Sequence, residues 1–268
     1  MKRLLMALNY RLSSRSRQIK LDHFWKLAAP FPNAIVLNLG AAPPHMHRTL
    51  LGMKNGDLVE QPEQDPRWSC LRVIGGNIHQ PDMDEYNGMY KGRGFHAVTL
   101  DGCRLPFADQ SVDIVFSNAV IEHLMPDAQR EMAEEIMRVG RAWFVTTPNF
   151  WYPIEMHNKL PFVHFLPTRA RLMIQRRLHT WPENDPLTLL SERNLAALFP
   201  GSTILKVRVT FYPETLIAFG KSPAHPGKSK SARADSLHCA PPDEARYQLA
   251  ERPLEIPFTP QNINHRKG

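Results

Sequence analysis

Short apolar runs separated by helical patterns occupy the middle of the chain. Seven runs rich in β-branched and aromatic residues predict strands at 34–39, 70–74, 95–100, 112–117, 142–147, 203–211 and 215–219. Between the fourth and fifth runs, apolar residues at helical spacing follow Pro126 and stop at Gly140. A further helix is expected over 191–198, with Ser191 as its amino-terminal cap. This alternation predicts an α/β fold with a doubly wound, mostly parallel sheet and helices on both faces.

The two ends of the chain differ from this centre. Residues 1–29 carry leucines at helical spacing and predict a basic N-terminal helix that ends before Pro30. Residues 30–221 are expected to form the main domain, with an insertion at about 150–190 covering its site. The last two runs, joined by a turn at 212–214, predict an antiparallel hairpin. Residues 222–268 lack periodicity and are rich in Pro, Lys and Ser, which predicts a disordered tail.

The formal net charge of +7 lies mainly at the ends, since residues 1–29 contain seven basic residues and one acid. This helix is either a solvated helix face or an arm that meets nucleic acid or, as a peripheral contact, an anionic membrane surface. The near-neutral centre argues against nucleic acid as the partner. No apolar run is long enough to span a membrane, and no cleavage site follows the short leucine-rich start. With three widely spaced cysteines, the sequence predicts a cytoplasmic protein, whose oligomeric state it leaves open.

The first candidate motif is AIVLNLGAAPPH, residues 34–45. Here an apolar strand runs directly into Gly40, whose missing side chain lets a ligand approach the backbone closely. In doubly wound folds ligands bind at the carboxyl ends of the strands, beside the next helix amino terminus. The motif therefore predicts a ligand contact at Gly40, although a strand followed by a glycine turn is also a common plain connection.

The second motif, LDGCRLPFADQSVDIVFSNAVIEHL at residues 100–124, is denser and more specific. It resembles the class I S-adenosylmethionine-dependent methyltransferases, in particular their type 11-like branch. There the corresponding segment reads D-x-x-x-LPF-x-D-x-S-x-D-x-V-x-S-x-x-x-x-EH. A third segment, EEIMRVGRAWFVTTPN at residues 134–149, is similar to the helix and strand that follow in the same branch. The resemblance covers about residues 35–221 and implies a Rossmann-like seven-stranded sheet whose last strand is antiparallel.

The resemblance also implies a cofactor, S-adenosyl-L-methionine, and a set of residues that hold it. Asp101 would accept a hydrogen bond from the adenine amino group, Gly102 would offer its backbone N–H to the ring, and Leu105 would line the ring pocket together with Phe107. Asp113 is interpreted as structural. The methionine end of the donor would face the remaining residues, namely Gly40, Ala42, Ser117 and Asn118.

The chain departs from the family pattern in two places. The first motif has Asn38 where the family has an acid, and Ala42 and Pro44 where it has glycines. The acid that holds the ribose hydroxyls is also missing after the second strand. By position Asn77 or His79 would take its place, and Glu60 only if the second strand lay nearer residue 58. An uncharged amide holds hydroxyls more weakly than a carboxylate does.

Methyl transfer depends mainly on alignment and needs a base only where the acceptor loses a proton. His157, with Glu155 to orient it, and His123 are the catalytic candidates, and His164 is a weaker one. Each also has a purely structural alternative: His123 can cap or pack against a helix, and the Glu155–His157 pair can fix a loop. Their spacing matches no familiar metal site, so no metal is expected. A basic amphipathic helix over 168–178 either covers the site and favours an anionic acceptor, or is a solvated packing face.

The sequence thus predicts a methyltransferase that acts on a small or medium acceptor. A binding or scaffold protein that kept the fold and lost turnover is the first alternative, favoured by the altered first motif. An RNA methyltransferase that uses residues 1–29 as an arm is the second. A nicotinamide dehydrogenase would need GxGxxG after the first strand, which the sequence GAAPPH does not provide.

Overall fold

The computed structural model of the chain describes residues 2–42, 62–155, 160–178 and 187–223. Its centre is a seven-stranded sheet in the order β3-β2-β1-β4-β5-β7-β6. The strands β1 to β5 are parallel to one another, whereas β7 is antiparallel to both β5 and β6. The strands are β1 (Ile35–Leu39), β2 (Arg72–Asn77), β3 (Phe95–Thr99), β4 (Val112–Asn118), β5 (Gly140–Pro148), β6 (Thr203–Val207) and β7 (Thr215–Lys221).

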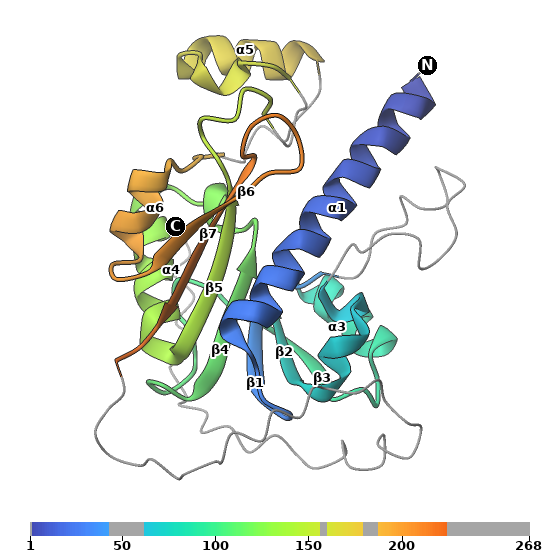
Figure 1. Ribbon diagram of the computed structural model, residues 1–268, viewed down its shortest axis with the longest axis vertical. Helices are drawn as coiled ribbons and strands as arrows, with labels where there is room; N and C mark the ends of the chain where they lie inside the picture. The colour runs from blue at the N-terminus through green and yellow to red at the C-terminus, as the bar shows by residue number, and fades with distance from the viewer. Residues whose placement is uncertain (1, 43–61, 156–159, 179–186, 224–268) are drawn as a thin grey trace.

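Helices cover both faces of this sheet, as Figure 1 shows. One face carries α1 (Lys2–Ala28) and α3 (Gln80–Met89), and the other carries α4 (Pro126–Val139) and α6 (Glu192–Leu198). A fifth helix, α5 (Thr168–Leu178), lies apart from both layers, beyond the end of the sheet at the top of the figure. Four short 3-10 helices complete the described elements: η1 (Pro62–Gln64), η2 (Pro66–Cys70), η3 (Ile121–His123) and η4 (Val163–Phe165).

Two separate apolar cores hold the layers together because strand side chains alternate between the faces. Val36 in β1 belongs to the core under α1 and α3, and its neighbour Leu37 belongs to the core under α4 and α6. The middle residues of β1, β2, β4 and β5 are buried, as expected for strands covered on both sides. The sequence prediction of a doubly wound α/β sheet with an antiparallel last strand is therefore confirmed.

The carboxyl-terminal half of α1 is part of the first core. Phe24 is fully buried, and its ring centroid lies 5.4 Å from Trp68, 5.3 Å from Phe116 and 5.5 Å from Phe144. Leu21 and Ala28 are buried in the same cluster. This part of the predicted basic helix is therefore packed on the sheet by aromatic contacts, and its register against β4 and β5 is fixed.

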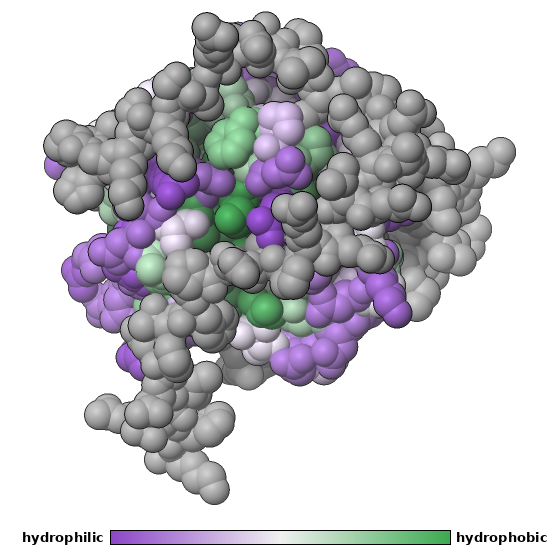
Figure 2. All heavy atoms as spheres, turned by 90° about the horizontal axis from the view of Figure 1, so that it is seen from below, coloured by the Kyte–Doolittle hydropathy of each residue, from purple (hydrophilic) through white to green (hydrophobic). Residues whose placement is uncertain are grey.

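Figure 2 views the molecule from below, at the end where the parallel strands begin. Apolar atoms are visible at its centre and polar residues surround them. The strands run away from the viewer in this picture, so their carboxyl ends lie at the opposite end of the molecule, on the side of α5. By the rule for open α/β sheets, a ligand is expected at that opposite end.

Some elements differ from the sequence expectations. The second strand begins at Arg72 and continues through two glycines to Asn77, where the periodicity predicted 70–74. The sixth strand ends at Val207, not at residue 211, because the Glu214 carboxylate accepts the Val209 N–H that a strand would donate to a neighbour. The helix α3 was not predicted, since its polar sequence lacks an apolar stripe. The predicted disordered tail lies outside the described residues from 224 onward.

Candidate functional site

The carboxyl ends of β1 and β2 meet in a tight turn at Gly40. Gly40 has a φ of +80°, and a Cβ atom at this position would lie 2.3 Å from the Val120 side chain. Its backbone N–H donates to Gly76 O over 2.8 Å, which binds the turn to the end of β2. Only glycine tolerates both the left-handed backbone and this close approach. The predicted Ala42 follows as a half-buried residue, and Pro44 lies outside the described residues.

Asn77, predicted to follow the second strand, is the last residue of β2 beside this turn, and its amide contacts the backbone. Its Nδ2 donates to Ala41 O over 2.9 Å, and its Oδ1 accepts from Ile78 N over 2.7 Å and from His79 N over 3.4 Å. His79 begins α3 and forms an exposed pair with Asp82. The alternative of Glu60 fails because β2 lies at 72–77; Glu60 itself is outside the described residues. In this structure Asn77 therefore fixes the Gly40 turn.

Asp101 and Gly102 follow β3, the strand next to β2. Asp101 is exposed, and its Oδ1 accepts from Cys103 N over 2.9 Å, which holds a tight turn. Gly102 is half-buried, and a Cβ there would be in ordinary contact with Met132 of α4. A carboxylate at this position is free to face a ligand that lies over the ends of β1 and β2.

The loop after Asp101 is anchored on α4. Leu105 and Phe107, expected to line the adenine pocket, are both buried in the core under α4. Arg138 donates to the carbonyl oxygens of both residues, over 3.0 Å and 2.8 Å, and Glu135 accepts from Leu105 N over 2.7 Å. The core under α4 therefore holds both side chains in place.

At the end of β4, Ser117 and Asn118 differ in orientation. Ser117 is fully buried, and its Oγ has no hydrogen-bond partner among the described residues. Asn118 is half-buried, and its Oδ1 accepts from Thr146 Oγ1 over 2.8 Å and from Lys20 Nζ over 2.6 Å. The next residue, Ala119, has a φ of +58°, a conformation that is uncommon outside glycine and often found at functional sites. Lys20 comes from α1, and no motif around it predicts a place at this strand end.

A buried acid lies just beyond Asn118. Glu122 in η3 is fully buried, and its Oε2 accepts from Thr147 Oγ1 over 3.2 Å. Burial raises the pKa of this carboxyl to about 7, against the smaller lowering effects of His123, its hydrogen bonds and Lys20. The tip of β4 thus holds a carboxyl group that titrates close to neutral pH.

A second buried acid occupies the neighbourhood of the altered first motif. Glu63 Oε1 accepts from Asn38 Nδ2 over 2.5 Å and from Tyr86 Oη over 2.7 Å, and Glu63 Oε2 is buried with no hydrogen-bond partner among the described residues. Burial raises the pKa of Glu63 above its ordinary value. A carboxyl group is therefore present beside position 38, although it comes from a segment 25 residues away. Sequence reasoning missed it, because a single Glu in a Pro- and Gln-rich stretch has no motif around it.

The histidine candidates are placed unevenly. His157 lies outside the described residues, and its predicted partner Glu155 is 1% exposed, with its backbone N–H donating to Leu160 O. His123 is half-buried in η3, one residue after Glu122. His164 is buried, its Nε2 lies 2.9 Å from Phe150 O, and burial lowers its pKa. That contact ties His164 to the loop after β5.

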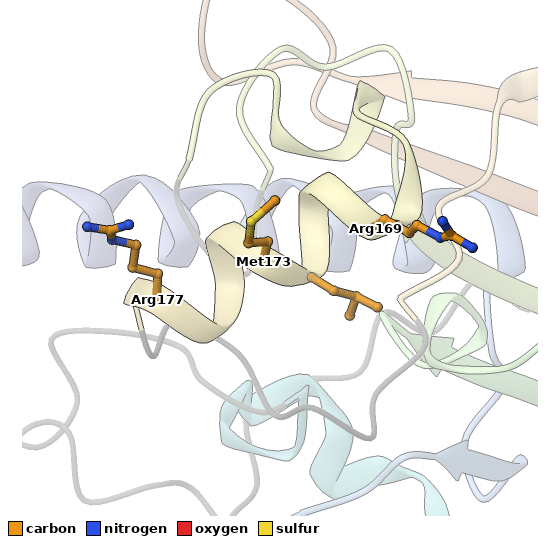
Figure 3. A pocket seen from close by; sticks show the side chains of 4 residues that line it. Arg169, Met173 and Arg177 are labelled. Carbon is orange, nitrogen blue, oxygen red and sulfur yellow. The ribbon is translucent and has the colours of Figure 1, made fainter.

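The predicted basic helix is α5, which lies beyond the carboxyl ends of the strands. A hollow of about 510 Å³ is lined by Arg169, Leu172, Met173 and Arg177 of this helix. Figure 3 shows Arg169 and Arg177 toward opposite ends of the helix with Met173 between them. Residues four apart share one face of a helix, so the hollow combines apolar contact with two cations.

The described residues also bear on metal binding, membrane crossing and the role of Asp113. Across the part of the chain that the structure describes, no group of three or more His, Cys, Asp or Glu side chains is arranged to hold a metal ion. The helices in that part include none with the length and apolar character needed to cross a bilayer. Asp113, expected to be structural, accepts from Ile35 N over 2.9 Å and pairs with Arg141 over 2.6 Å, which confirms that interpretation.

Comparison with known proteins supports the resemblance seen in the sequence. The family described as "Methyltransferase domain" matches residues 52–142, and no curated protein matches the chain. Several solved structures are similar at low identity. The PH0226 protein from Pyrococcus horikoshii OT3 is 14% identical, with 78% of this chain and 91% of that chain covered and a TM-score of 0.48. A SAM-dependent methyltransferase from Methanosarcina mazei is 13% identical, with 72% and 93% covered and a TM-score of 0.42.

A third similar structure is phosphoethanolamine N-methyltransferase 2 from Haemonchus contortus in complex with S-adenosyl-L-methionine. It is 12% identical, with 71% of this chain and 38% of that chain covered and a TM-score of 0.46. The segment matched by the family runs through β2, β3, β4 and α4, the elements that carry Asn77, Asp101 and Asn118. Residues 52–142 are therefore similar to a methyltransferase domain, and the solved structures share the fold of the chain.

Proposed function

We propose that the protein transfers a methyl group from S-adenosyl-L-methionine to a small or medium acceptor, in a cleft at the carboxyl ends of β1 to β4. The observation that carries this proposal is the convergence of Gly40, Asp101 and Asn118. They follow β1, β3 and β4, which lie among the four successive strands β3-β2-β1-β4, and Leu39 at the end of β1 is paired with both Gly76 and Ser117. Three sequence segments up to 78 residues apart thus present a bare backbone turn, a carboxylate and an amide at one edge.

Two features fit the donor. The left-handed Gly40 turn, packed against Val120, presents backbone without a side chain at the carboxyl end of β1, where ligands of such sheets bind. The exposed Asp101 provides an acceptor for an amino group on a flat ring. When bound, the donor would supply a methyl group on a positively charged sulfur. Gly40, Asp101, Gly102 and Asn118 would orient it, and Ala42 and Ser117 would close the pocket.

On the acceptor side we infer an anionic small molecule held under α5. The hollow beside this helix has two arginines on either side of apolar side chains, which suits an amphipathic anion. His123, and His157 with Glu155, are proposed as the groups that take a proton from the acceptor where one is lost. For most of the reaction the protein contributes alignment of the acceptor with the methyl group.

A binding protein without turnover is the second candidate. The amide of Asn77 is engaged with the backbone at both ends, so it has little capacity left for ribose hydroxyls. Weak ribose contact would lower the affinity for the donor, and binding without transfer would result if alignment were lost as well. The near-neutral centre continues to argue against an RNA methyltransferase.

Calorimetric titration of the full-length protein with S-adenosyl-L-methionine and with S-adenosylhomocysteine tests the proposal. We expect saturable binding of both with a stoichiometry of one, followed by release of S-adenosylhomocysteine when a panel of small carboxylic and phosphorylated acceptors is added. Binding without release over a broad panel would favour the second candidate. If a folded sample bound neither compound, the proposed function would be wrong.

A further inference from the structure

Lys20 lies against Asn118 because the packing of α1 fixes it there. The side chains of Lys20 and Phe24 are four residues apart and share one face of the helix. Phe24 packs on Phe116, and Asn118 is two residues further along the same face of β4. One helical turn of about 5.4 Å and two strand residues of about 6.6 Å are nearly equal lengths. Lys20 therefore meets Asn118 in the same way as Phe24 meets Phe116, one helical turn and two strand residues further along.

The hydrogen bond between them settles the orientation of the Asn118 amide. An ammonium group can only donate, so the Asn118 atom that it meets over 2.6 Å has to be Oδ1. Thr146 Oγ1 donates to the same oxygen. Nδ2 is left as the second polar atom of a half-buried side chain, and no described residue accepts from it. The Nδ2 group of Asn118 is therefore available as a hydrogen-bond donor, and Lys20 contacts the Oδ1 atom of the same amide.

The surroundings of Lys20 make its charge easy to change. The side chain is 8% exposed, and burial lowers its pKa to about 8, with Arg17 on α1 acting in the same direction. Glu122 in η3 and Glu214 before β7 act in the opposite direction. The groups packed around it from β4 and β5, Asn118 and Thr146, are uncharged. A further positive charge nearby is expected to drive off the proton, because like charges in a buried site disfavour each other.

We propose that Lys20 is a specificity-determining residue that distinguishes the methyl donor from its product, by giving up a proton when a sulfonium binds beside Asn118. This rests on the proposed function, which places the donor's methyl group at the end of β4. A thioether product is uncharged at sulfur and would leave the ammonium of Lys20 in place. Lys20 is thus a neutral amine in the complex with the donor and an ammonium in the complex with the product.

The proton balance of one turnover agrees with this role. The acceptor forms a bond to the methyl carbon, the carbon–sulfur bond breaks, and its electron pair stays on sulfur. The acceptor's proton goes to the free amine of Lys20, directly or through water, so that the positive charge lost at sulfur reappears on Lys20. No oxidant, reductant or further reactant is needed.

Proton release on binding is the direct measurement. The full-length protein is titrated at pH 8 with S-adenosyl-L-methionine and with S-adenosylhomocysteine in two buffers of different ionisation enthalpy. A group that titrates near pH 8 and becomes neutral on binding releases about half a proton. The donor's own α-amino group also titrates near this pH. The quantity of interest is therefore the difference between the wild-type protein and Lys20→Met for the same ligand.

Three variants define the outcome. Lys20→Met removes the charge and keeps the length of the side chain, and we expect it to abolish the extra proton release on donor binding. Lys20→Arg keeps a charge that cannot be released, and we expect it to weaken donor binding about tenfold relative to product binding. Lys26→Met removes an exposed charge from the same helix and should behave as the wild type. Circular dichroism and thermal unfolding establish that each variant is folded.

Opposite effects of Lys20→Arg and Lys20→Met on the ratio of donor to product affinity would support the proposal, because a merely structural lysine would be impaired by both changes in the same direction for both ligands. Equal proton release for donor and product in the wild type would overturn it, as would indistinguishable ratios in the wild type and Lys20→Arg. If the wild type bound neither ligand, the proposed function would fail first, and the two failures are therefore distinguishable.

Discussion

The carboxyl ends of β1 to β3 and those of β4 and β5 hold their polar groups in different ways. At the turns after β2 and β3 the polar groups are held by backbone contacts: Asn77 donates to Ala41 O beside Gly40, and Asp101 accepts from Cys103 N. At the ends of β4 and β5 most polar groups are buried, and half-buried Asn118 depends on a contact from a distant element, Lys20 of α1. We therefore call the turns at the ends of β1 to β3 the rigid region and the groups at the ends of β4 and β5 the charge-responsive region.

This difference has a physical origin. Local turns satisfy polar groups near the surface, where water screens any charge that remains. Buried groups such as Glu122 and Lys20 have lost their water, so each alters the protonation of its neighbours. Groups with pKa values moved toward neutrality tend to occur where proton chemistry takes place. The proposed function would thus place recognition of the donor at β1–β3 and methyl transfer at β4–β5.

The largest effect is expected in the rigid region, from Gly40→Ala. The new Cβ would meet Val120 at 2.3 Å in a left-handed backbone, which should cost about 2–4 kcal/mol of unfolding free energy and abolish product binding. Gly201→Ala is the matched control, because it has a φ of +78° with open space around it, and should cost about 1 kcal/mol. Urea denaturation measures both. Equal losses would show that only backbone strain, and no close approach, constrains Gly40.

A second test in the same region is Asp101→Ala. Loss of a charged acceptor for the adenine amino group should weaken S-adenosylhomocysteine binding about 10- to 100-fold by calorimetry. Asp127→Ala removes an exposed acid paired with Arg130 and should leave the affinity unchanged. An Asp101→Ala protein that bound as tightly as the control variant would remove Asp101 from the proposed donor site.

In the charge-responsive region, Glu122→Gln should raise stability at alkaline pH. The carboxyl has a pKa of about 7 in the folded protein and an ordinary value of 4.5, so the folded state binds a proton that the unfolded state has lost between these values. Stability therefore falls as pH rises through this window, and the loss is complete above pH 7. Gln should recover about 1–3 kcal/mol at pH 8 and almost nothing at pH 4.5.

Denaturation curves at the two pH values check this prediction. Glu134→Gln on the exposed side of α4 is a suitable control, since it removes one acid without changing a buried group. A gain of the same size at both pH values would mean that the Glu122 carboxyl does not ionise in the folded protein over this range.

The smallest effect concerns Cys103, next to the donor region. Burial and the nearby Asp101, Glu131 and Glu135 raise the pKa of its thiol to about 11. At pH 8 the reactive thiolate should be about 100-fold scarcer than for an ordinary cysteine, so alkylation by iodoacetamide should be correspondingly slow. Peptide mass spectrometry follows the modification, with the same peptide in the urea-unfolded chain as reference. Rapid alkylation in the folded protein would show a more open loop at Asp101 than the structure has.

The sequence was sufficient for the elements of the sheet, whereas the donor-binding roles it suggested stay predictions. All seven strands were predicted near their observed positions, because runs of β-branched residues between turn residues indicate a strand from local sequence alone. Gly40, Asp101 and Asn118 were found from motif and position, and the sheet brings them to one edge. His157 could not be assessed, since it lies outside the described residues.

The tertiary structure alone decided the partners of the charged side chains. Arg138 of α4 pairs with Glu135 and Asp109 and donates to two carbonyl oxygens of the loop after β3. Glu63 reaches Asn38 across 25 residues, and Lys20 reaches Asn118 across 98. Periodicity and turn chemistry depend on near neighbours in the chain, and so they are written in the sequence. A buried charge takes its partner from whatever element packs against it, and only the folded chain defines that.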